Sequence, residues 1–315
     1  MQRAIGLVPL LFGISIFIFL IVHLAPGGPM AVYAFSPDFT PEVQAQIERN
    51  LGLDQPLHVQ YVKWAQGMLT GNWGRSYKDG REVRDVIFER LPATLILMGT
   101  ALLFSLIVAI PIGMFTATRP QAWVRYAVNI LTMLGISVPT FWTGLVTIMV
   151  LSGMLRLVPA GGMFTIGQPF SLADRLHHLI TPALVLAAVN IAVWARYTHS
   201  SLIEILQEDY VRTARAKGLA ERLIVLRHAL KNAMIVIVTL LGLSIPGLFS
   251  GALVTEVVFS WPGNGRLITE ALLGRNYPVL MADFLILAML AVLGNFMADV
   301  AYAFIDPRIR FAAHE

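Results

Sequence analysis

Long apolar stretches separated by short charged segments dominate the pattern of this chain. A helix that crosses the hydrocarbon layer of a membrane, about 30 Å thick, needs about 20 largely apolar residues. Five stretches without Asp, Glu, Lys or Arg reach that length: Ala4–Pro37, Leu91–Thr118, Tyr126–Leu155, Leu176–Ala195 and Asn232–Thr255. A sixth apolar stretch, Val279–Phe304, contains Asp283 near its start and Asp299 near its end. The pattern therefore predicts an all-α integral membrane protein with six transmembrane helices.

The two acids restrict where the sixth stretch can lie. The uncharged segment between them, Phe284–Ala298, has 15 residues and would span only about 22 Å as a helix. Charged side chains are costly within a membrane and face an interface or the interior of a bundle. We therefore place Asp283 and Asp299 in such positions. Asn295 shares a helical face with Asp299, so we expect these two to hydrogen-bond to a neighbouring helix rather than to couple ions.

Composition supports this interpretation and excludes other classes of protein. The 315 residues are 57% hydrophobic and 13% charged, include no cysteine and carry a formal net charge of +4. Soluble domains have about 25% charged residues, so half the expected charge is missing and a soluble globule is excluded. A disordered chain would need low hydrophobicity and high charge. The absence of cysteine excludes a disulfide scaffold, a cysteine nucleophile and a thiolate metal site.

The distribution of Lys and Arg predicts how the chain is oriented in the membrane. Twelve of them fall in the segments on the side of the two termini, whereas four fall in the short loops of the other side. Short cytoplasmic loops carry the excess of positive charge, so both termini are expected in the cytoplasm. The first apolar core, Ala4–Leu24, is longer than the 7–15 residues of a signal peptide. We therefore interpret residues 1–25 as an uncleaved first transmembrane helix.

Residues 26–90 form the expected extracytoplasmic segment, and its pattern is helical. Thr40 suits an N-cap and Pro41 the first helical position, and a stripe of Val43, Ile47 and Leu51 then ends at Gly52. A second stripe contains three apolar residues before Asn72–Gly74 interrupts it: Leu57, Tyr61 and Met68. This segment is either a docking surface for a partner or a lid packed on the bundle.

The cytoplasmic segment 204–232 lies within the expected five-helix core of residues 91–306 and carries ten charged residues. Tyr210, Ala214 and Lys217 recur at helical spacing, Gly218 suits the left-handed end of a helix, and Leu219–Lys231 can form a second short helix. Such a basic, amphipathic pair fits two interpretations. It lies on anionic lipid headgroups, or it offers a helix to a groove on a cytoplasmic partner.

These segments resemble the inner-membrane permease subunits of the peptide/nickel class of ABC importers, which are components of binding-protein-dependent transport. DYVRTARAKG (Asp209–Gly218) and RHALKNA (Arg227–Ala233) resemble the family's EAA motif. Four further matches occur in the family's order: PGGP (Pro26–Pro29), LGLDQPL (Leu51–Leu57), EVVFSWPGNGR (Glu256–Arg266) and DPRIR (Asp306–Arg310). Arg212 and Thr213 depart from the broad EAA pattern in the way typical of the peptide subgroup. Gly28 and Asn72–Trp73 depart from the family pattern on the outer side.

The resemblance implies a type I importer fold and a subunit that forms half of a translocation pathway. It implies a bacterial inner-membrane complex with a second homologous permease subunit, two ATP-binding subunits that bind ATP and Mg²⁺, and an extracytoplasmic solute-binding protein. Di- or oligopeptides are the expected substrates, with nickel chelates and oligosaccharides as alternatives; residues 307–315 are the expected cytoplasmic tail. The residues assigned to contact with the ATPases are Tyr210, Arg212, Thr213, Ala214, Arg215, Ala216, Lys217, Gly218, His228 and Asn232.

The chain lacks motifs that would make it an enzyme. A P-loop requires Gly-Lys-Ser or Gly-Lys-Thr at its end, and none of the four lysines is followed by Ser or Thr: Lys63, Lys78, Lys217 and Lys231. His177 and His178 are adjacent and point to different faces of a helix, so they are a poor metal pair. We therefore expect no cofactor and no metal bound by this chain. A stand-alone secondary carrier is the remaining alternative, but it would be expected to bury acids nearer mid-membrane.

Overall fold

The computed structural model describes residues 2–24, 52–119, 137–250 and 252–305, with isolated positions between 42 and 49 and between 123 and 133. In these ranges the chain is helical apart from loops, turns and one isolated bridge between Arg75 and Glu82. The helices are α1 (Gln2–Leu24), α3 (Leu57–Thr70), α4 (Val83–Thr118), α6 (Thr140–Thr147), π-helix η2 (Ile148–Met154), α7 (Leu172–Leu206), α8 (Asp209–Ala216), α9 (Glu221–Leu223), π-helix η3 (Ile224–Ala229), α10 (Leu230–Ser250), α11 (Leu253–Val258), α12 (Asn264–Leu273) and α13 (Tyr277–Ile305). The predicted all-α class is confirmed.

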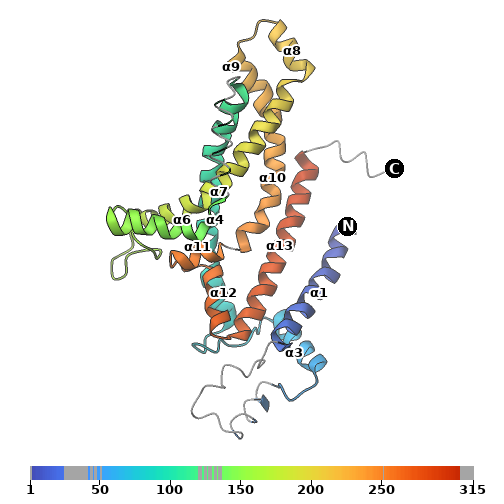
Figure 1. Cartoon of the computed structure of the whole chain (residues 1–315). Coiled ribbons are helices and arrows are strands. Elements are labelled where there is room, and N and C mark those ends of the chain that lie inside the picture. Colours follow the sequence, from blue (N-terminus) through green and yellow to red (C-terminus); the bar gives the residue numbers. More distant parts are fainter. Residues whose placement is uncertain are drawn as a thin grey trace.

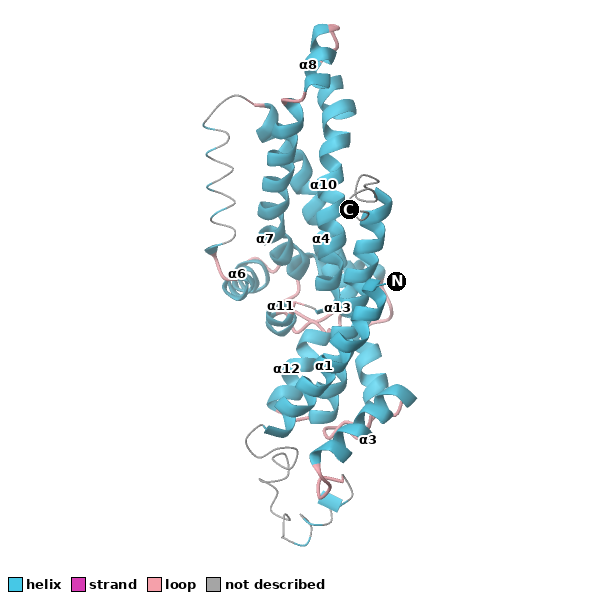
Figure 2. Ribbon diagram, turned by 90° about the vertical axis from the view of Figure 1, so that its right-hand side faces the viewer, coloured by secondary structure: helices cyan, strands magenta, loops and turns pink. Residues whose placement is uncertain are grey.

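Five helical segments of the described residues are long and apolar enough to cross a membrane: Gly6–Leu24, Val83–Thr118, Leu172–Leu206, Glu221–Phe249 and Tyr277–Met297. They correspond to five of the six expected spans. The remaining one, Tyr126–Leu155, lies partly outside the described residues, and its described part is the shorter apolar helix Thr140–Met154. This helix lies across the long helices, as both views show (Figures 1 and 2). The count of six spans stays a prediction.

The pair α4 and α7 forms the most extensive contact between helices. Small residues let the two backbones approach, as is common in membrane helices. A Cβ on Gly113 of α4 would lie 2.5 Å from the Cβ of Thr198 and 2.7 Å from the carbonyl oxygen of Ala195 on α7. Ser171 caps α7, and its hydroxyl accepts a hydrogen bond from the Asp174 N–H at 3.3 Å. The α4–α7 pair is therefore the rigid frame of the fold.

One end of the molecule, which we call the α3 end, is closed by α3, α12 and the first turns of α4 and α13 (Figure 1). Its buried cluster joins Phe19 of α1, Ile87 of α4 and Leu280 of α13. Tyr61 of α3 packs on this cluster and hydrogen-bonds to Ser15 of α1 at 2.8 Å. The helix predicted from the second apolar stripe is thus confirmed, and it packs on the bundle.

The other expectations for this outer segment have mixed outcomes. Gly52 has a positive φ of 68°, which suits its predicted place at the end of a helix. The residues of the expected cap and stripe before it lie outside the described residues: Thr40, Pro41, Val43, Ile47 and Leu51. The boundary expected between residues 90 and 91 falls inside α4, because that helix begins at Val83.

The opposite end, which we call the α8 end, carries α8 and α9. Here the expected separate helix at 219–231 is wrong in one respect, because the chain stays helical from Glu221 to Ser250. No Gly or Pro occurs between Glu221 and Gly242 to interrupt it. A π-helical segment, η3, joins α9 to α10. The fifth expected span is therefore the continuation of the second helix of the cytoplasmic segment.

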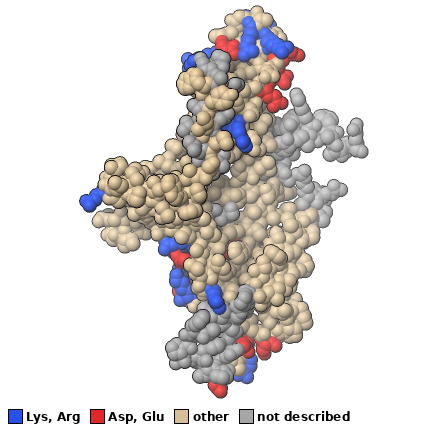
Figure 3. All heavy atoms as spheres, in the orientation of Figure 1, with Lys and Arg blue, Asp and Glu red and all other residues tan. Residues whose placement is uncertain are grey.

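Charged side chains gather at the two ends of the molecule (Figure 3). On the face shown, Lys, Arg, Asp and Glu cluster over α8 and again around the α3 end, and the surface between them is nearly free of them. The first turn of α1 and the last turn of α13 lie at mid-height and point the same way (Figure 1). The nearly uncharged surface between the two ends, which we call the charge-poor belt, fits the hydrocarbon layer of a membrane.

Candidate functional site

The loop predicted to contact a partner is an ordered helical hairpin at the α8 end. Val211 and Ala214 of α8 are buried against Ile224 of η3 and half-buried Leu206 at the end of α7. Of the ten residues expected to make the contact, Ala214 therefore faces inward and holds the hairpin together. Six others lie on the exposed side of α8 and its turn: Tyr210, Arg212, Thr213, Arg215, Ala216 and Lys217.

Gly218 turns the chain between the two helices. Its φ is +77°, which confirms the predicted left-handed end of the first helix. Its N–H donates to the Arg215 carbonyl at 2.9 Å, and the Leu219 N–H donates to the Ala214 carbonyl at 3.4 Å. These two bonds are the pattern of a Schellman motif, which satisfies the last carbonyls of a helix. The sequence of the turn thus fixes where α8 stops.

An ion pair closes the hairpin across Gly218. The Arg215 guanidinium donates to both carboxylate oxygens of Glu221, at 2.7 Å and 3.1 Å. A third bond, at 3.4 Å, joins Arg215 to the Leu206 carbonyl. The hydrogen bond to Glu221 raises the pKa of Arg215 above its ordinary value, so Arg215 carries its charge at every relevant pH. Bidentate pairs of this kind add geometric precision, which favours a fixed hairpin shape.

The two residues predicted from the second motif lie at the base of the hairpin. Asn232 donates to the Tyr210 hydroxyl at 2.7 Å and to the His228 carbonyl at 3.2 Å. His228 and Asn232 are half-buried, and the bond from Asn232 fixes the position of the Tyr210 hydroxyl. Four further cations are exposed on the hairpin: Arg212, which pairs with Asp209 at 3.5 Å, and Lys217, Arg222 and Arg227.

The position of α8 separates the two interpretations of this segment. Helix α8 lies at the tip of the molecule, well beyond the ends of α1 and α13 (Figures 1 and 2). A pair that rests on lipid headgroups would be expected directly at the edge of the charge-poor belt. The geometry therefore favours a partner that receives the hairpin in a groove.

A second cluster, near the α3 end, was only partly foreseen from the sequence. Glu256 of α11 is fully buried and accepts hydrogen bonds from the Thr94 hydroxyl at 2.8 Å and the Arg266 N–H at 3.0 Å. Thr94 in turn accepts from the Asn264 N–H at 2.7 Å. These amides belong to the first turn of α12, whose N-cap residue, Gly263, has no side chain. Glu256 thus caps α12 from another helix.

The same cluster fixes α12 to its neighbours. Asn264 donates to Asp283 of α13 at 2.7 Å, and Trp261 donates to the Ala93 carbonyl of α4 at 2.8 Å. A Cβ on Gly263 would lie within about 2.5 Å of the Glu256 carboxylate, so only Gly fits there. Of the two positions predicted for Asp283, a membrane interface or the bundle interior, the structure shows a buried one, since Asp283 is 0% exposed. Asn295 is exposed, and the side chain of Asp299 lies outside the described residues.

The adjacent residues His177 and His178 contact different backbone carbonyls. His177 Nε2 lies 2.7 Å from the Leu157 carbonyl, and His178 Nδ1 lies 2.9 Å from the Asp174 carbonyl. In the part of the chain that the structure describes, no three His, Cys, Asp or Glu residues are grouped so that they could hold a metal ion.

Comparison with known proteins places these features in context. Residues 109–311 match the family profile of binding-protein-dependent transport system inner membrane components, and residues 1–98 match the N-terminal profile of the same components. The chain is 41% identical to the oligopeptide transport system permease protein AppB of Bacillus subtilis, with 98% of each chain covered. It is 37% identical to the dipeptide permease DppB of Escherichia coli, over 98% of this chain and 97% of that one.

Two further similarities agree with these. The glutathione transport system permease protein GsiC of Salmonella paratyphi A is 39% identical over 99% of this chain and 98% of its own. Among solved structures, the inward-facing MetNI methionine ABC transporter matches with a TM-score of 0.57 and 18% identity. That match covers 70% of this chain and 96% of the other. At this identity the structural match bears on the fold, which is that of a type I importer permease.

Proposed function

Since this chain belongs to the family of binding-protein-dependent transport system inner membrane components, we propose that it is the permease subunit of an ATP-driven importer of di- or oligopeptides. It is a multi-pass membrane protein and a transporter component, and such permeases work with ATPase and other subunits. The relatives named for oligopeptides, dipeptides and glutathione support a peptide substrate. A nickel chelate or an oligosaccharide is the alternative cargo.

The ordered hairpin is the observation that carries the mechanism. It projects from the frame of α4 and α7, its turn is fixed by Gly218 and its shape by the Arg215–Glu221 pair. A rigid, exposed hairpin can pass a movement of its partner to the membrane helices, because its buried side is packed against the end of α7. When cytoplasmic ATPases close on ATP, they move α8, and the long helices that continue from the hairpin turn with it. Access then alternates between the two sides of the membrane.

The partners follow from this arrangement. A second, homologous permease completes the pathway, two ATP-binding subunits receive the hairpins, and an extracytoplasmic solute-binding protein delivers the peptide. The chain itself has no P-loop lysine, so ATP and Mg²⁺ are bound by the ATPase subunits and the permease needs no cofactor of its own. The excess of Lys and Arg on the α8 side supports cytoplasmic termini.

Reconstitution tests this proposal. The complex of both permeases with the ATPases and the binding protein, in proteoliposomes, is expected to accumulate a radiolabelled dipeptide only with ATP. Vesicles that contain the purified chain alone are expected to accumulate none. Uptake by the single chain without ATPases would instead identify a secondary carrier. If the binding protein prefers a nickel chelate or an oligosaccharide to a peptide, that compound is the cargo instead of the peptide.

A further inference from the structure

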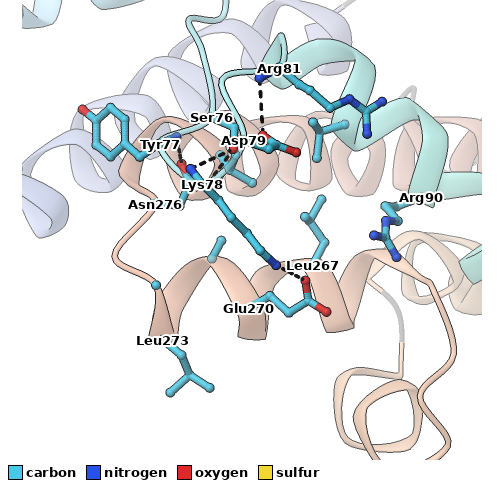
Figure 4. Close-up of a pocket in the computed structure, with 14 residues that line it drawn as sticks. Ser76, Tyr77, Lys78, Asp79, Arg81, Arg90, Leu267, Glu270, Leu273 and Asn276 are labelled. Atoms are coloured by element: carbon cyan, nitrogen blue, oxygen red, sulfur yellow. Dashed lines mark hydrogen bonds and ion pairs between the residues drawn. The ribbon is translucent and has the colours of Figure 1, made fainter. Parts of the chain in front are cut away.

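A cavity of about 480 Å³ opens at the α3 end, between the loop that precedes α4 and helix α12 (Figure 4). Its wall is mainly apolar, with contributions from Val86 of α4, Leu267 and Ala271 of α12, and Val279 of α13. Ligand sites are typically concave, apolar pockets of about 300–1,000 Å³ with a few placed polar groups. The size and lining of this cavity therefore fit a small organic molecule.

Charged side chains of both signs reach the cavity from two of its walls. Lys78 crosses from the loop to Glu270 of α12 at 3.2 Å (Figure 4). Outside the lining of the cavity, Arg266 binds the other oxygen of Glu270 at 2.9 Å. Partial burial acts to raise the pKa of Glu270. The hydrogen bond and charge of Lys78, together with Arg266, outweigh this effect, and the pKa of Glu270 therefore lies below its ordinary value. A hydrogen bond to Ser76 likewise lowers the pKa of Asp79. Both carboxylates are ionised at neutral pH.

Arg90 differs from these residues because it makes no hydrogen bond or ion pair with any residue that the structure describes. It projects from α4 towards the cavity (Figure 4) and is half-buried. It is also the last charged residue before the apolar run of α4. A guanidinium that is partly removed from water is stabilised by an anion, and a carboxylate matches its planar fork. The cavity thus offers one unpaired cation beside an apolar wall.

We infer that this cavity is a peptide subsite of the permease itself, in which Arg90 binds the terminal carboxylate and the apolar wall of α12 receives a side chain. The inference rests on the proposed function and adds a place where the permease recognises its cargo directly. The carboxylates of Asp79 and Glu270 line the same cavity. Lys78 and Arg266 already hold both oxygens of Glu270, so Asp79 is the acid that suits the ammonium end of the peptide. The two carboxylates would repel an anionic phospholipid, so the mixture of charges favours a zwitterion.

Equilibrium binding to the purified complex without its binding protein tests this site. The probes are radiolabelled Leu-Leu and its C-terminal amide, which differ only in the carboxylate. The unmodified complex is expected to bind the free acid about tenfold or more tightly than the amide, since charge-assisted bidentate bonds are strong. Arg90→Gln is expected to remove this preference and to leave amide binding unchanged, an outcome that a general loss of folding would not produce.

Arg84→Gln is the matched control, because Arg84 is an exposed residue of the same helix that does not line this cavity. It is expected to keep the acid-to-amide preference. Unchanged preference in Arg90→Gln overturns the inference. A second outcome also overturns it. If mass spectrometry finds an anionic phospholipid bound to the unmodified complex but not to Arg90→Gln, and peptide binding is the same in both, the cavity is a lipid site. A complex that shows ATP-dependent uptake but no acid-to-amide preference refutes the subsite and leaves the proposed function standing.

Discussion

At the residue scale, Glu256 replaces a cap that the sequence of α12 lacks. The helix starts after Gly263, which has no side chain to accept the first amides, so the acceptor has to come from elsewhere. Glu256 and Thr94 supply it, and both are 0% exposed. Without them, the amides at the start of α12 would be buried without partners, which costs about 1–3 kcal/mol for each group. The position of α12 thus depends on two side chains outside it.

Thr94→Val tests this cap with little change of shape. The substitution removes the hydroxyl that accepts from the Asn264 N–H and donates to Glu256. We expect a loss of stability of about 1–3 kcal/mol, seen as a lower melting temperature of the detergent-purified protein. Thr118→Val is the control, because its exposed hydroxyl bonds only within its own helix. Equal melting temperatures for the two variants would contradict the capping role.

Gly218 supports a second prediction at this scale. A Cβ would have nothing within 4 Å, so a side chain meets no neighbour and the cost comes from the positive φ alone. That cost is about 1–2 kcal/mol for most residues and smaller for Asn. Gly218→Leu is therefore expected to fray the end of α8 and to lower transport and stimulated ATPase activity together, with membrane insertion unchanged. Gly218→Asn should keep most of both. Unchanged ATP-dependent uptake in Gly218→Leu would refute the coupling role.

At the element scale, the helix, the glycine and the second helix of the cytoplasmic segment could be predicted from local signals. Spacing of Tyr210, Ala214 and Lys217 indicated the first helix, and Gly218 its end. The continuity of α9, η3 and α10 does not follow from the charge pattern, because the charges end at Lys231 whereas no helix breaker occurs before Gly242. The pairing of Arg215 with Glu221 does not follow from it either, since it depends on how the turn folds back. Local periodicity predicts elements but not how they continue.

A charge exchange tests the hairpin as a unit. Arg215→Glu places two acids opposite each other across the turn and is expected to lower stimulated ATPase activity. Glu221→Arg alone should do the same, whereas the double exchange restores the pair and should recover most of the activity. The exposed pair itself contributes only about 0–1 kcal/mol, so the effect concerns the shape of the hairpin. Arg212→Glu, at a site 73% exposed, should not be rescued by Glu221→Arg. Failure of the double exchange would assign Arg215 to the partner contact.

At the scale of the whole molecule, the pattern of apolar stretches predicted most of the fold, and the segregation of charge to two ends agrees with it (Figure 3). What could not be predicted is contact between distant parts. Thr94 and Glu256 are 162 positions apart, and neither has a neighbour in sequence that indicates the other. The cavity beside Arg90 depends on how α4, α12 and α13 meet, which one sequence does not encode locally. The long helices were predictable because each satisfies its own backbone in the membrane.

The two interpretations of the outer segment remain distinguishable by experiment at this scale. Helix α3 packs on α1, as a lid would, yet Asp54 and Pro56 just before it are exposed. If 51–56 is a docking surface, Asp54→Arg should reduce stimulation of ATPase activity by the binding protein and leave basal activity nearly unchanged. Asp85→Arg is the control, since Asp85 is an exposed acid on α4 at the same end. A lid would instead lose stability when disturbed, so an equal fall in basal and stimulated activity would favour it. Loss of stimulation alone would show that the exposed residues before α3 contact the binding protein, whereas α3 itself packs on the bundle.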